Sequence, residues 1–543
     1  MTVWISRRSG DALERARAAA PPGPLAGRLL AVKDNIDVAG FPTTAGCPEF
    51  AYEPAAAAPC VRRLEAAGAV VVGKTNMDQF ATGLVGTRSP YGVVSALGHP
   101  EVVSGGSSSG SAVAVASGEV DLALGTDTAG SGRVPAAMNG IVGLKPTRGL
   151  ISVEGVVPAC LSIDCVSVFA RTCAEARLAM CVAADPEGPA ARDRPLPARR
   201  ALAAAAAPRV GVPDPAALDF GDDPEGPGLF RAAVARLEAL GARTVDVDLA
   251  PFRAAGDLLY GGPWVAERLA AVGGFMRDNP AATLDPVVRS IILGAEGIDA
   301  VAAYRGRYAL DRIIRDAAGV WDRIDALLVP TVPFAPTIAE VAADPHGVNA
   351  RLGAYTSFVN LMDLCALALP AGARQSGVPF GVQLVAPALQ DALLCDIGTR
   401  FELGPAAGAR TVRLAVVGAH LRGQPLNHQL TERAARLVAV TESAPEYRLF
   451  RLDGTAPPKP GLVRAPGDGV GVELEVWELG EREFGSFVAE VPPPLAIGTV
   501  RLASGEEVKG FVCEPFAVEG ARDISGFGGW RAYLGSQASV RVP

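Results

Sequence analysis

The sequence predicts a large α/β domain followed by a compact β-rich domain, and three observations support this fold class. Residues 27–180 alternate short apolar runs, such as Leu29–Val32 and Ala69–Val72, with helix-like segments and glycine-rich connections. From residue 412 onward, short strand-like runs alternate with turns. The length of 543 residues exceeds what one hydrophobic core usually supports. We therefore expect domains at residues 1–405 and 412–543.

Within the first domain, the elements are expected in a definite order along the chain. A helix-like segment covers residues 112–117, and residues 185–208, rich in Pro, Ala and Arg, predict an exposed connector. Helical periodicity with few breakers marks residues 226–315. Further α/β elements resume at residues 325–330 and 377–384. The Gly/Ala/Pro stretch Gly404–Gly408 then predicts a linker to the second domain.

Composition narrows the class of protein. Hydrophobic residues make up 49% and charged residues 20%, which is typical of a globular protein and not of a disordered chain. A net charge of -8 offers no general basic surface, so nucleic acid is not expected as a partner. No apolar run has signal-peptide or membrane-span length, which predicts a cytoplasmic protein without a membrane partner. The nine cysteines lack CxxC spacing, so neither a metal site nor a disulfide framework is expected.

Two clusters of small residues carry the densest chemistry. They are Ser-Gly-Gly-Ser-Ser-Ser-Gly-Ser at residues 104–111 and Gly-Thr-Asp-Thr-Ala-Gly-Ser-Gly-Arg at residues 125–133. Glycines let the backbone approach a reacting group closely, and the residues before Ser131 can aim several N–H groups at an oxyanion. By themselves these runs also fit a phosphate cradle or a flexible loop. A P-loop is disfavoured, because neither cluster ends in Gly-Lys-Ser/Thr.

A serine nucleophile needs a base, and histidine is the usual one. Of the four histidines, only His99 is near these clusters in the sequence, and it has no evident orienting partner. The chain has only five lysines among its 50 Lys and Arg residues, so Arg is preferred where charge alone matters. A buried lysine can lose its proton, which a guanidinium cannot. This favours Lys33 as the base. For Lys459 and Lys509 the simpler interpretation is that they are lysines by chance in an arginine-rich composition.

Four ordered motifs resemble those of the amidase signature family. They are Ala-Val-Lys-Asp-Asn at residues 31–35, the two serine clusters, and Gly-Leu-Lys-Pro-Thr at residues 143–147. The resemblance implies an amidase-signature fold with a central mixed β-sheet flanked by helices. It also implies a Ser-Ser-Lys triad with Ser131 as nucleophile, Ser107 on a cis peptide as proton relay and Lys33 as base. Backbone N–H groups around Thr128, Ala129 and Gly130 would form the oxyanion hole.

Residues 76–92 and 157–167, together with Ala129, are similar to the corresponding segments of allophanate hydrolases. This resemblance implies a small substrate, allophanate, that carries one carboxylate and one terminal amide. Tyr260 and Arg268 match the positions that hold the substrate carboxylate, and a planar guanidinium suits that group. The Gly-Gly-Pro that ends at Pro263 should start a helix there. Gly83 matches a close-packed wall of the pocket.

Residues 412–543 also resemble a known domain, the allophanate hydrolase C-terminal domain, which is similar to the γ-glutamylcyclotransferase-like fold. The resemblance implies that this domain decarboxylates the first product, N-carboxycarbamate, with His420 as the candidate residue. A histidine that only satisfies its hydrogen bonds at a strand-loop junction is an equally good interpretation.

The resemblance implies no cofactor and a homodimer. No biotin-attachment Met-Lys-Met is present, so a separate urea carboxylase or a biuret hydrolase is the expected functional link. Three functions remain open: an allophanate hydrolase, an amidase of another small amide such as the glutaminase subunit of a tRNA-dependent amidotransferase, and a non-catalytic scaffold. The intact Lys33, Ser107 and Ser131 argue against the scaffold.

Overall fold

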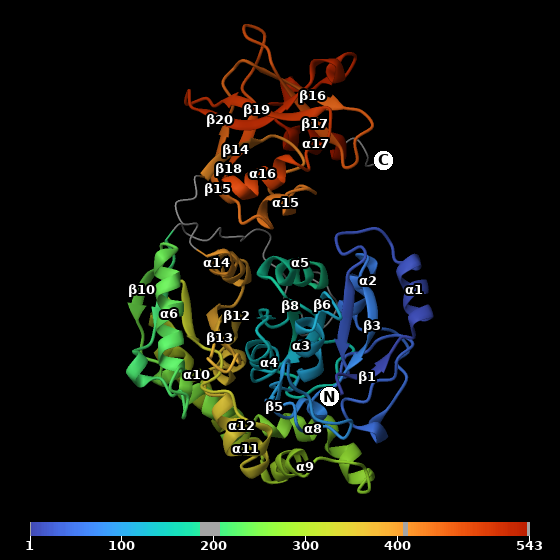
Figure 1. Ribbon diagram of the computed structural model, residues 1–543, viewed down its shortest axis with the longest axis vertical. Helices are drawn as coiled ribbons and strands as arrows, with labels where there is room; N and C mark the ends of the chain where they lie inside the picture. Colours follow the sequence, from blue (N-terminus) through green and yellow to red (C-terminus); the bar gives the residue numbers. More distant parts are fainter. Residues whose placement is uncertain (1, 185–206, 405–410, 540–543) are drawn as a thin grey trace. The chain divides into compact units, whose positions relative to one another are not determined.

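The computed structural model describes residues 2–184, 207–404 and 411–539 (Figure 1). The predicted connector at 185–208 and the linker at 404–408 fall almost entirely outside these residues. The chain divides into two compact units, Met1–Gly404 and Pro405–Pro543. Among the described residues, no helix combines the length and the apolar composition that crossing a bilayer requires.

A mixed β-sheet forms the centre of the first unit. Strand β2 pairs in parallel with both of its neighbours, whereas β8, β7, β12 and β13 pair antiparallel. In sheet order the strands of the described residues are β1 (Trp4–Arg7), β3 (Val70–Thr75), β2 (Leu29–Lys33), β6 (Leu122–Asp127), β8 (Cys165–Ala170), β7 (Val142–Lys145), β12 (Leu364–Ala373), β13 (Pro379–Pro387), β11 (Ala326–Pro330), β9 (Arg209–Val212) and β10 (Arg243–Asp246). A separate two-stranded ribbon joins β4 (Ser95–Ala96) to β5 (His99–Val103).

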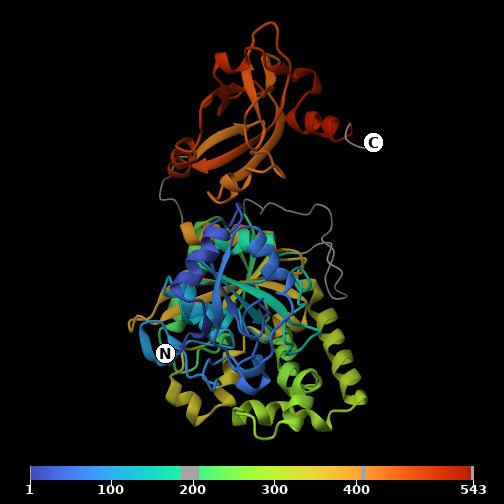
Figure 2. The same cartoon turned by 90° about the vertical axis from the view of Figure 1, so that its right-hand side faces the viewer.

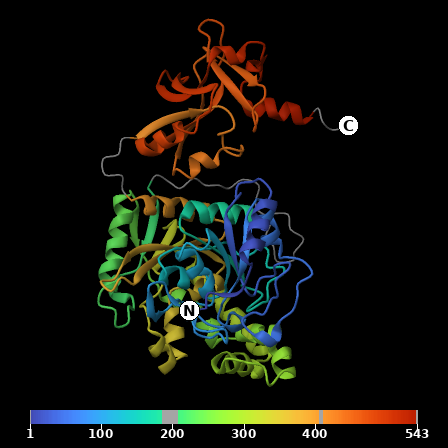
Figure 3. The same ribbon diagram turned by 45° about the vertical axis from the view of Figure 1, so that its right-hand side comes forward.

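Helices cover both faces of this sheet. Figures 1 and 3 show α5 and α14 next to each other against one face, and α8 and α9 pack together at one end of the unit (Figures 1 and 2). The helices are α1 (Gly10–Ala19), α2 (Pro59–Ala66), α3 (Ser109–Ala116), α4 (Arg133–Met138), α5 (Cys173–Ala183), α6 (Gly226–Ala239), α7 (Ala250–Gly261), α8 (Val265–Asp278), α9 (Pro286–Leu293), α10 (Ala300–Ala317), α11 (Ile338–Ala343), α12 (Gly347–Leu352), α13 (Ser357–Leu361) and α14 (Asp391–Leu403). The predicted α/β class, with a central mixed sheet flanked by helices, is confirmed.

Two local expectations need correction. The segment 226–315 is not helical throughout, because Arg243–Asp246 forms strand β10 at the sheet edge beside β9. The helix expected at Pro263 begins at Val265, after Pro263 and Trp264 complete the turn from α7.

The second unit is rich in β-structure, as predicted. One sheet has the order β15 (Arg436–Glu442), β18 (Glu473–Gly480), β14 (Thr411–Val416), β20 (Glu507–Cys513) and β19 (Leu495–Arg501). A second sheet joins β17 (Lys459–Arg464), β16 (Tyr447–Leu452) and β21 (Arg522–Asp523). The helices are α15 (His428–Thr431), α16 (Glu481–Val488) and α17 (Trp530–Ser539). This unit has a hydrophobic core of its own, which includes Leu414, Val476 and Trp530.

Candidate active site

The alternation of side chains along β2 positions Lys33. Leu30 and Val32 belong to the core on one face of the sheet, whereas Ala31 belongs to the core that α3 covers on the other face. Lys33 lies two residues beyond Ala31 and therefore points to the α3 face. There its amine lies 2.8 Å from Ser107 Oγ and 2.8 Å from Thr126 Oγ1, fully buried.

Burial controls the charge of Lys33. Loss of solvent lowers the pKa of the Lys33 amine to about 7, although the charges of Asp78, Asp127 and Asp164 partly oppose the shift. Among the described residues no carboxylate lies within 4 Å of this amine to hold it protonated. A large fraction of Lys33 is therefore neutral near pH 7, and its lone pair can accept the hydroxyl proton of Ser107.

Ser107, the expected relay, lies just before α3, and the peptide bond between Gly106 and Ser107 is cis, as the family resemblance implies. The Asp78 amide donates to the Ser107 carbonyl at 3.1 Å, and the buried Asp78 carboxylate accepts from the amides of Val85, Gly86 and Arg88. A Cβ atom on Gly106 would lie 2.1 Å from Asp78 Oδ2, so this position requires glycine. Asp78 thus holds the loop that carries Ser107, a role that its position within the 76–92 motif did not reveal.

The expected nucleophile and oxyanion donors lie in the turn between β6 and α4. Ser131 Oγ donates to the Gly83 carbonyl at 3.5 Å. Among the described residues, Ser107 Oγ is bound by Lys33, and no hydrogen bond joins Ser107 to Ser131. The amides of Ala129, Gly130 and Ser131 donate to no other described residue, although all three residues are buried. Buried N–H groups without a partner are rare in folded proteins. Three in succession therefore form a ready site for an oxyanion.

A buried ion pair fixes the far side of this turn. Arg133, the first residue of α4, donates to both carboxylate oxygens of Asp127 at 2.9 Å, and Asp127 also accepts from the Gly132 amide. The same guanidinium donates to Gln383 and to Asn360. Strand β6 and helix α4 are thereby joined on either side of the expected oxyanion donors.

The structure brings Tyr260, near the end of α7, together with Arg268, in the first turn of α8. The Arg268 guanidinium is buried and lies over the Tyr260 ring, 5.5 Å from its centroid. Its Nη1 donates to Cys160 Sγ at 2.7 Å, while its Nε has no hydrogen-bond partner. No carboxylate of the described residues lies within 4 Å of this cation. A buried cation without a counterion favours binding of an anionic group.

Asp164 connects the surroundings of Arg268 to residues 128–132, the turn between β6 and α4 that carries the expected oxyanion donors and is called the oxyanion turn below. Thr128 Oγ1 donates to Asp164 Oδ1 at 2.5 Å, and the amides of Ala159 and Cys160 donate to the same carboxylate. Sequence reasoning gave neither Asp164 nor Cys160 a role. Each was visible only as part of the 157–167 motif.

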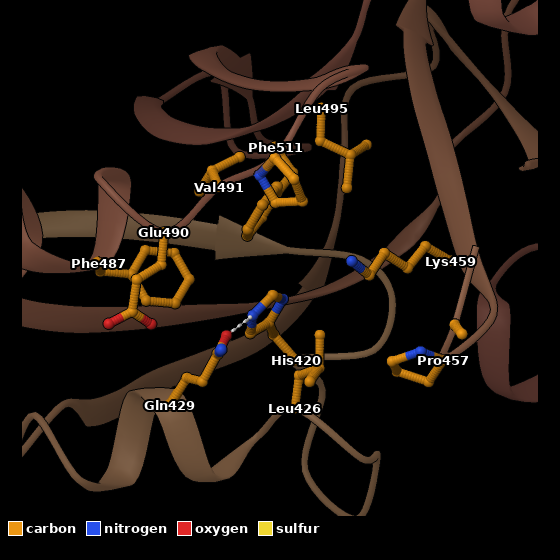
Figure 4. A pocket seen from close by; sticks show the side chains of 12 residues that line it. His420, Leu426, Gln429, Pro457, Lys459, Phe487, Glu490, Val491, Leu495 and Phe511 are labelled. Carbon is orange, nitrogen blue, oxygen red and sulfur yellow. Dashed lines mark hydrogen bonds between the residues drawn. The ribbon is translucent and has the colours of Figure 1, made fainter.

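In the second unit, His420 lines a cavity of about 140 Å³ (Figure 4). Its Nε2 lies 2.8 Å from Gln429 Oε1, and its ring stacks on Phe511. Burial lowers the pKa of His420 to about 4, so the imidazole is neutral near pH 7. Lys459 extends its amine into the space beside His420 (Figure 4). The sequence alone gave this lysine no role.

Both units of the chain match known protein families. Residues 5–395 match the amidase family model, and residues 412–535 match the model of the allophanate hydrolase C-terminal domain. The allophanate hydrolase of Kluyveromyces lactis superposes with a TM-score of 0.74 at 42% identity, over 98% of this chain and 93% of that one.

Two curated relatives extend the comparison. The urea amidolyase of Lachancea kluyveri is 44% identical over 96% of this chain, but the chain spans only about 30% of the length of that enzyme. The 2-amino-5-chloromuconic acid deaminase of Comamonas testosteroni is 38% identical over 70% of this chain and 82% of its own length. Because the family model covers residues 5–395, and because Lys33 and Ser107 form a buried hydrogen bond, the chain belongs to the amidase family.

Proposed function

We propose that this protein is an allophanate hydrolase, in which residues 1–405 cleave the terminal amide and residues 412–543 process the product. Lys33 is the base, Ser107 the relay and Ser131 the nucleophile, with the amides around Thr128, Ala129 and Gly130 as the oxyanion hole. Gly83 forms the wall beside the nucleophile, because its carbonyl accepts from Ser131 Oγ at 3.5 Å. A Cβ atom there would lie 2.7 Å from Asp78 Oδ2, so the position excludes a side chain. Tyr260 and Arg268 hold the substrate carboxylate.

The observation that carries this proposal is the buried Arg268 without a counterion, connected through Cys160 and Asp164 to Thr128 of the oxyanion turn. A general amidase has no need for a buried cation near its oxyanion hole. Allophanate has a carboxylate one nitrogen atom away from the carbonyl that is attacked, so both ends of the substrate find a partner. Glutamine, which has a longer chain and an ammonium group, fits this arrangement less well.

The reaction follows from these contacts. Neutral Lys33 accepts the proton of Ser107 while Ser107 accepts the proton of Ser131. The Ser131 Oγ then gives up its hydrogen bond to the Gly83 carbonyl and attacks the amide carbon. The negative charge that develops on the carbonyl oxygen meets the free amides of the turn. The C–N bond then breaks, and the proton returns through Ser107 to the departing ammonia. Water hydrolyses the acyl-enzyme by the same relay and releases N-carboxycarbamate.

Initial rates of ammonia release from four compounds test the proposed function. Allophanate and its methylene analogue malonamate should be hydrolysed, whereas biuret and glutamine should be poor substrates because each lacks a carboxylate at this distance from the amide. A glutaminase activity that exceeds the activity on allophanate would replace this proposal with the amidotransferase function.

The activity should depend on pH through Lys33. Because only the neutral amine accepts a proton, kcat/KM for malonamate should fall about tenfold per pH unit below pH 7 and level off above it. The lowered pKa also means that the unfolded chain binds more protons between pH 7 and 10.5, so the contribution of Lys33 to stability rises across that range. Malonamate stays ionised throughout, so substrate titration does not interfere. A flat profile between pH 5.5 and 8.5 would exclude a base with this pKa.

For the second unit we propose decarboxylation of N-carboxycarbamate at His420. The amine of Lys459 supplies a positive charge for a dicarboxylate in the cavity, and Gln429 orients the imidazole. Binding of a dianion raises the pKa of His420 and so favours its protonation. The protonated ring can then deliver a proton to the nitrogen atom from which carbon dioxide departs.

Substitution His420→Ala should separate the two products in time. Ammonia from the first step should appear at the wild-type rate, whereas carbon dioxide should lag behind it in a rapid-mixing record. Because N-carboxycarbamate also breaks down spontaneously, the early time course matters and the steady state does not. Malonamate serves as a control, since its product malonate yields no carbon dioxide. If carbon dioxide appears without a lag, the second unit has another role.

We further propose that the enzyme acts as a cytoplasmic homodimer. Its substrate comes from a reaction that carboxylates urea or hydrolyses biuret, because either reaction yields allophanate. The match to urea amidolyases supports a link to urea carboxylation.

A further inference from the structure

The thiol of Cys160 occupies a position where a carboxylate is the more usual partner of a buried arginine. Cys160 Sγ accepts from Arg268 Nη1 at 2.7 Å and donates its proton to the Trp264 carbonyl at 3.3 Å. Burial raises the pKa of this thiol to about 11, so it is uncharged near pH 7. The thiol therefore orients the guanidinium without neutralising it.

Residues 159–164, which carry Cys160, are bound both to α8 and to the oxyanion turn. Glu267, the neighbour of Arg268 on α8, accepts from the Ser162 amide at 2.8 Å and from the Ser162 hydroxyl. At the other end the Asp164 carboxylate binds the Cys160 amide and Thr128 Oγ1. Residues 159–164 thus form a short bridge between the arginine and the oxyanion turn.

We propose that Cys160 is a positioning residue that makes the site specific for anionic amides: it orients Arg268 toward the substrate while leaving the guanidinium charge to the substrate carboxylate. This proposal rests on the proposed role of Arg268. A carboxylate at position 160 would form an internal ion pair with Arg268, and the substrate would then have to compete with it. An apolar residue there would leave Nη1 without a partner and free the guanidinium to turn away.

The comparison of Cys160→Asp with Cys160→Asn tests the proposal, because the two side chains differ in charge and hardly in size. Both full-length variants would be assayed for ammonia release from malonamate and from its neutral amide, malonamide. Cys160→Asp should raise KM for malonamate at least about tenfold above that of Cys160→Asn, with similar kcat. For malonamide the two variants should agree within about twofold. Cys160→Ser, which keeps a neutral donor and acceptor, should stay within about threefold of the wild type.

The outcomes separate this inference from the proposed function. A wild-type enzyme that hydrolyses malonamate no better than malonamide would contradict the carboxylate site itself. A wild type that prefers malonamate, combined with equal KM values for Cys160→Asp and Cys160→Asn, would overturn only the role of Cys160. If Cys160→Asp does not fold, Cys160→Ala takes its place, and KM should then rise several-fold for malonamate alone. An equal loss on both substrates would make Cys160 merely structural.

Discussion

Ser131→Ala should abolish ammonia release from allophanate, and Lys33→Arg should cost nearly as much. The first change removes the nucleophile. The second leaves a guanidinium that cannot give up its proton, so it cannot accept one from Ser107. By analogy with other serine hydrolases, kcat should fall by a factor on the order of 10⁴ in each variant. Steady-state ammonia assays on purified protein measure the effect.

Lys74→Arg provides a matched control for the substitution at Lys33. Lys74 is equally buried on the neighbouring strand, but it lies 3.5 Å from Asp34 and forms an ion pair. Arginine preserves that charge, so the Lys74 variant should lose far less activity despite the same increase in side-chain volume. Near wild-type activity in Lys33→Arg would rule out Lys33 as the base, because no proton could then pass to it.

Arg268→Lys should raise KM for malonamate on the order of 100-fold, with a much smaller change for malonamide. Lysine keeps the positive charge but loses the paired N–H groups that bind a carboxylate side by side. The two substrates differ only at the end that Arg268 is proposed to bind, so the ratio of their kcat/KM values isolates that contact.

Arg277→Lys is the control on the same helix. Arg277 is exposed and forms a 3.4 Å ion pair with Glu296, so its replacement should leave kcat/KM unchanged for both substrates. If Arg268→Lys lowered kcat/KM equally for malonamate and malonamide, Arg268 would have no contact with the carboxylate.

Sequence motifs predicted that Lys33 lies with Ser107 and that Tyr260 lies with Arg268, whereas Asp78, Cys160 and Asp164 had no predicted role. The alternating pattern of β2 even determines the face on which Lys33 lies, because the period of a strand is two residues. The motifs could not predict that the Lys33 amine has a pKa near 7, since that depends on complete burial among elements far apart in the chain.

Contacts between distant segments explain the remaining differences. Cys160 and Arg268 are 108 residues apart, and hydrogen bonds from residues 159–164 to Thr128 and to α8 support their contact. Strand β10 has four residues and, within the described part of the chain, pairs only with β9, so the helical periodicity of the segments around it concealed the strand. Local propensity is a weak guide wherever such pairing decides the structure.

The Asp127–Arg133 pair also constrains how this sequence can change over generations. Both side chains are fully buried, so replacing either alone leaves a charge without a counterion, which typically costs about 3 to 5 kcal/mol. Exchanging both for apolar residues would avoid that cost, but it would also remove the acceptor of the Gly132 amide and release the turn that carries Ser131. A single substitution of either residue is therefore strongly destabilising, and a double substitution to apolar residues would abolish activity. A lineage that keeps the chemistry must inherit the two residues as one unit.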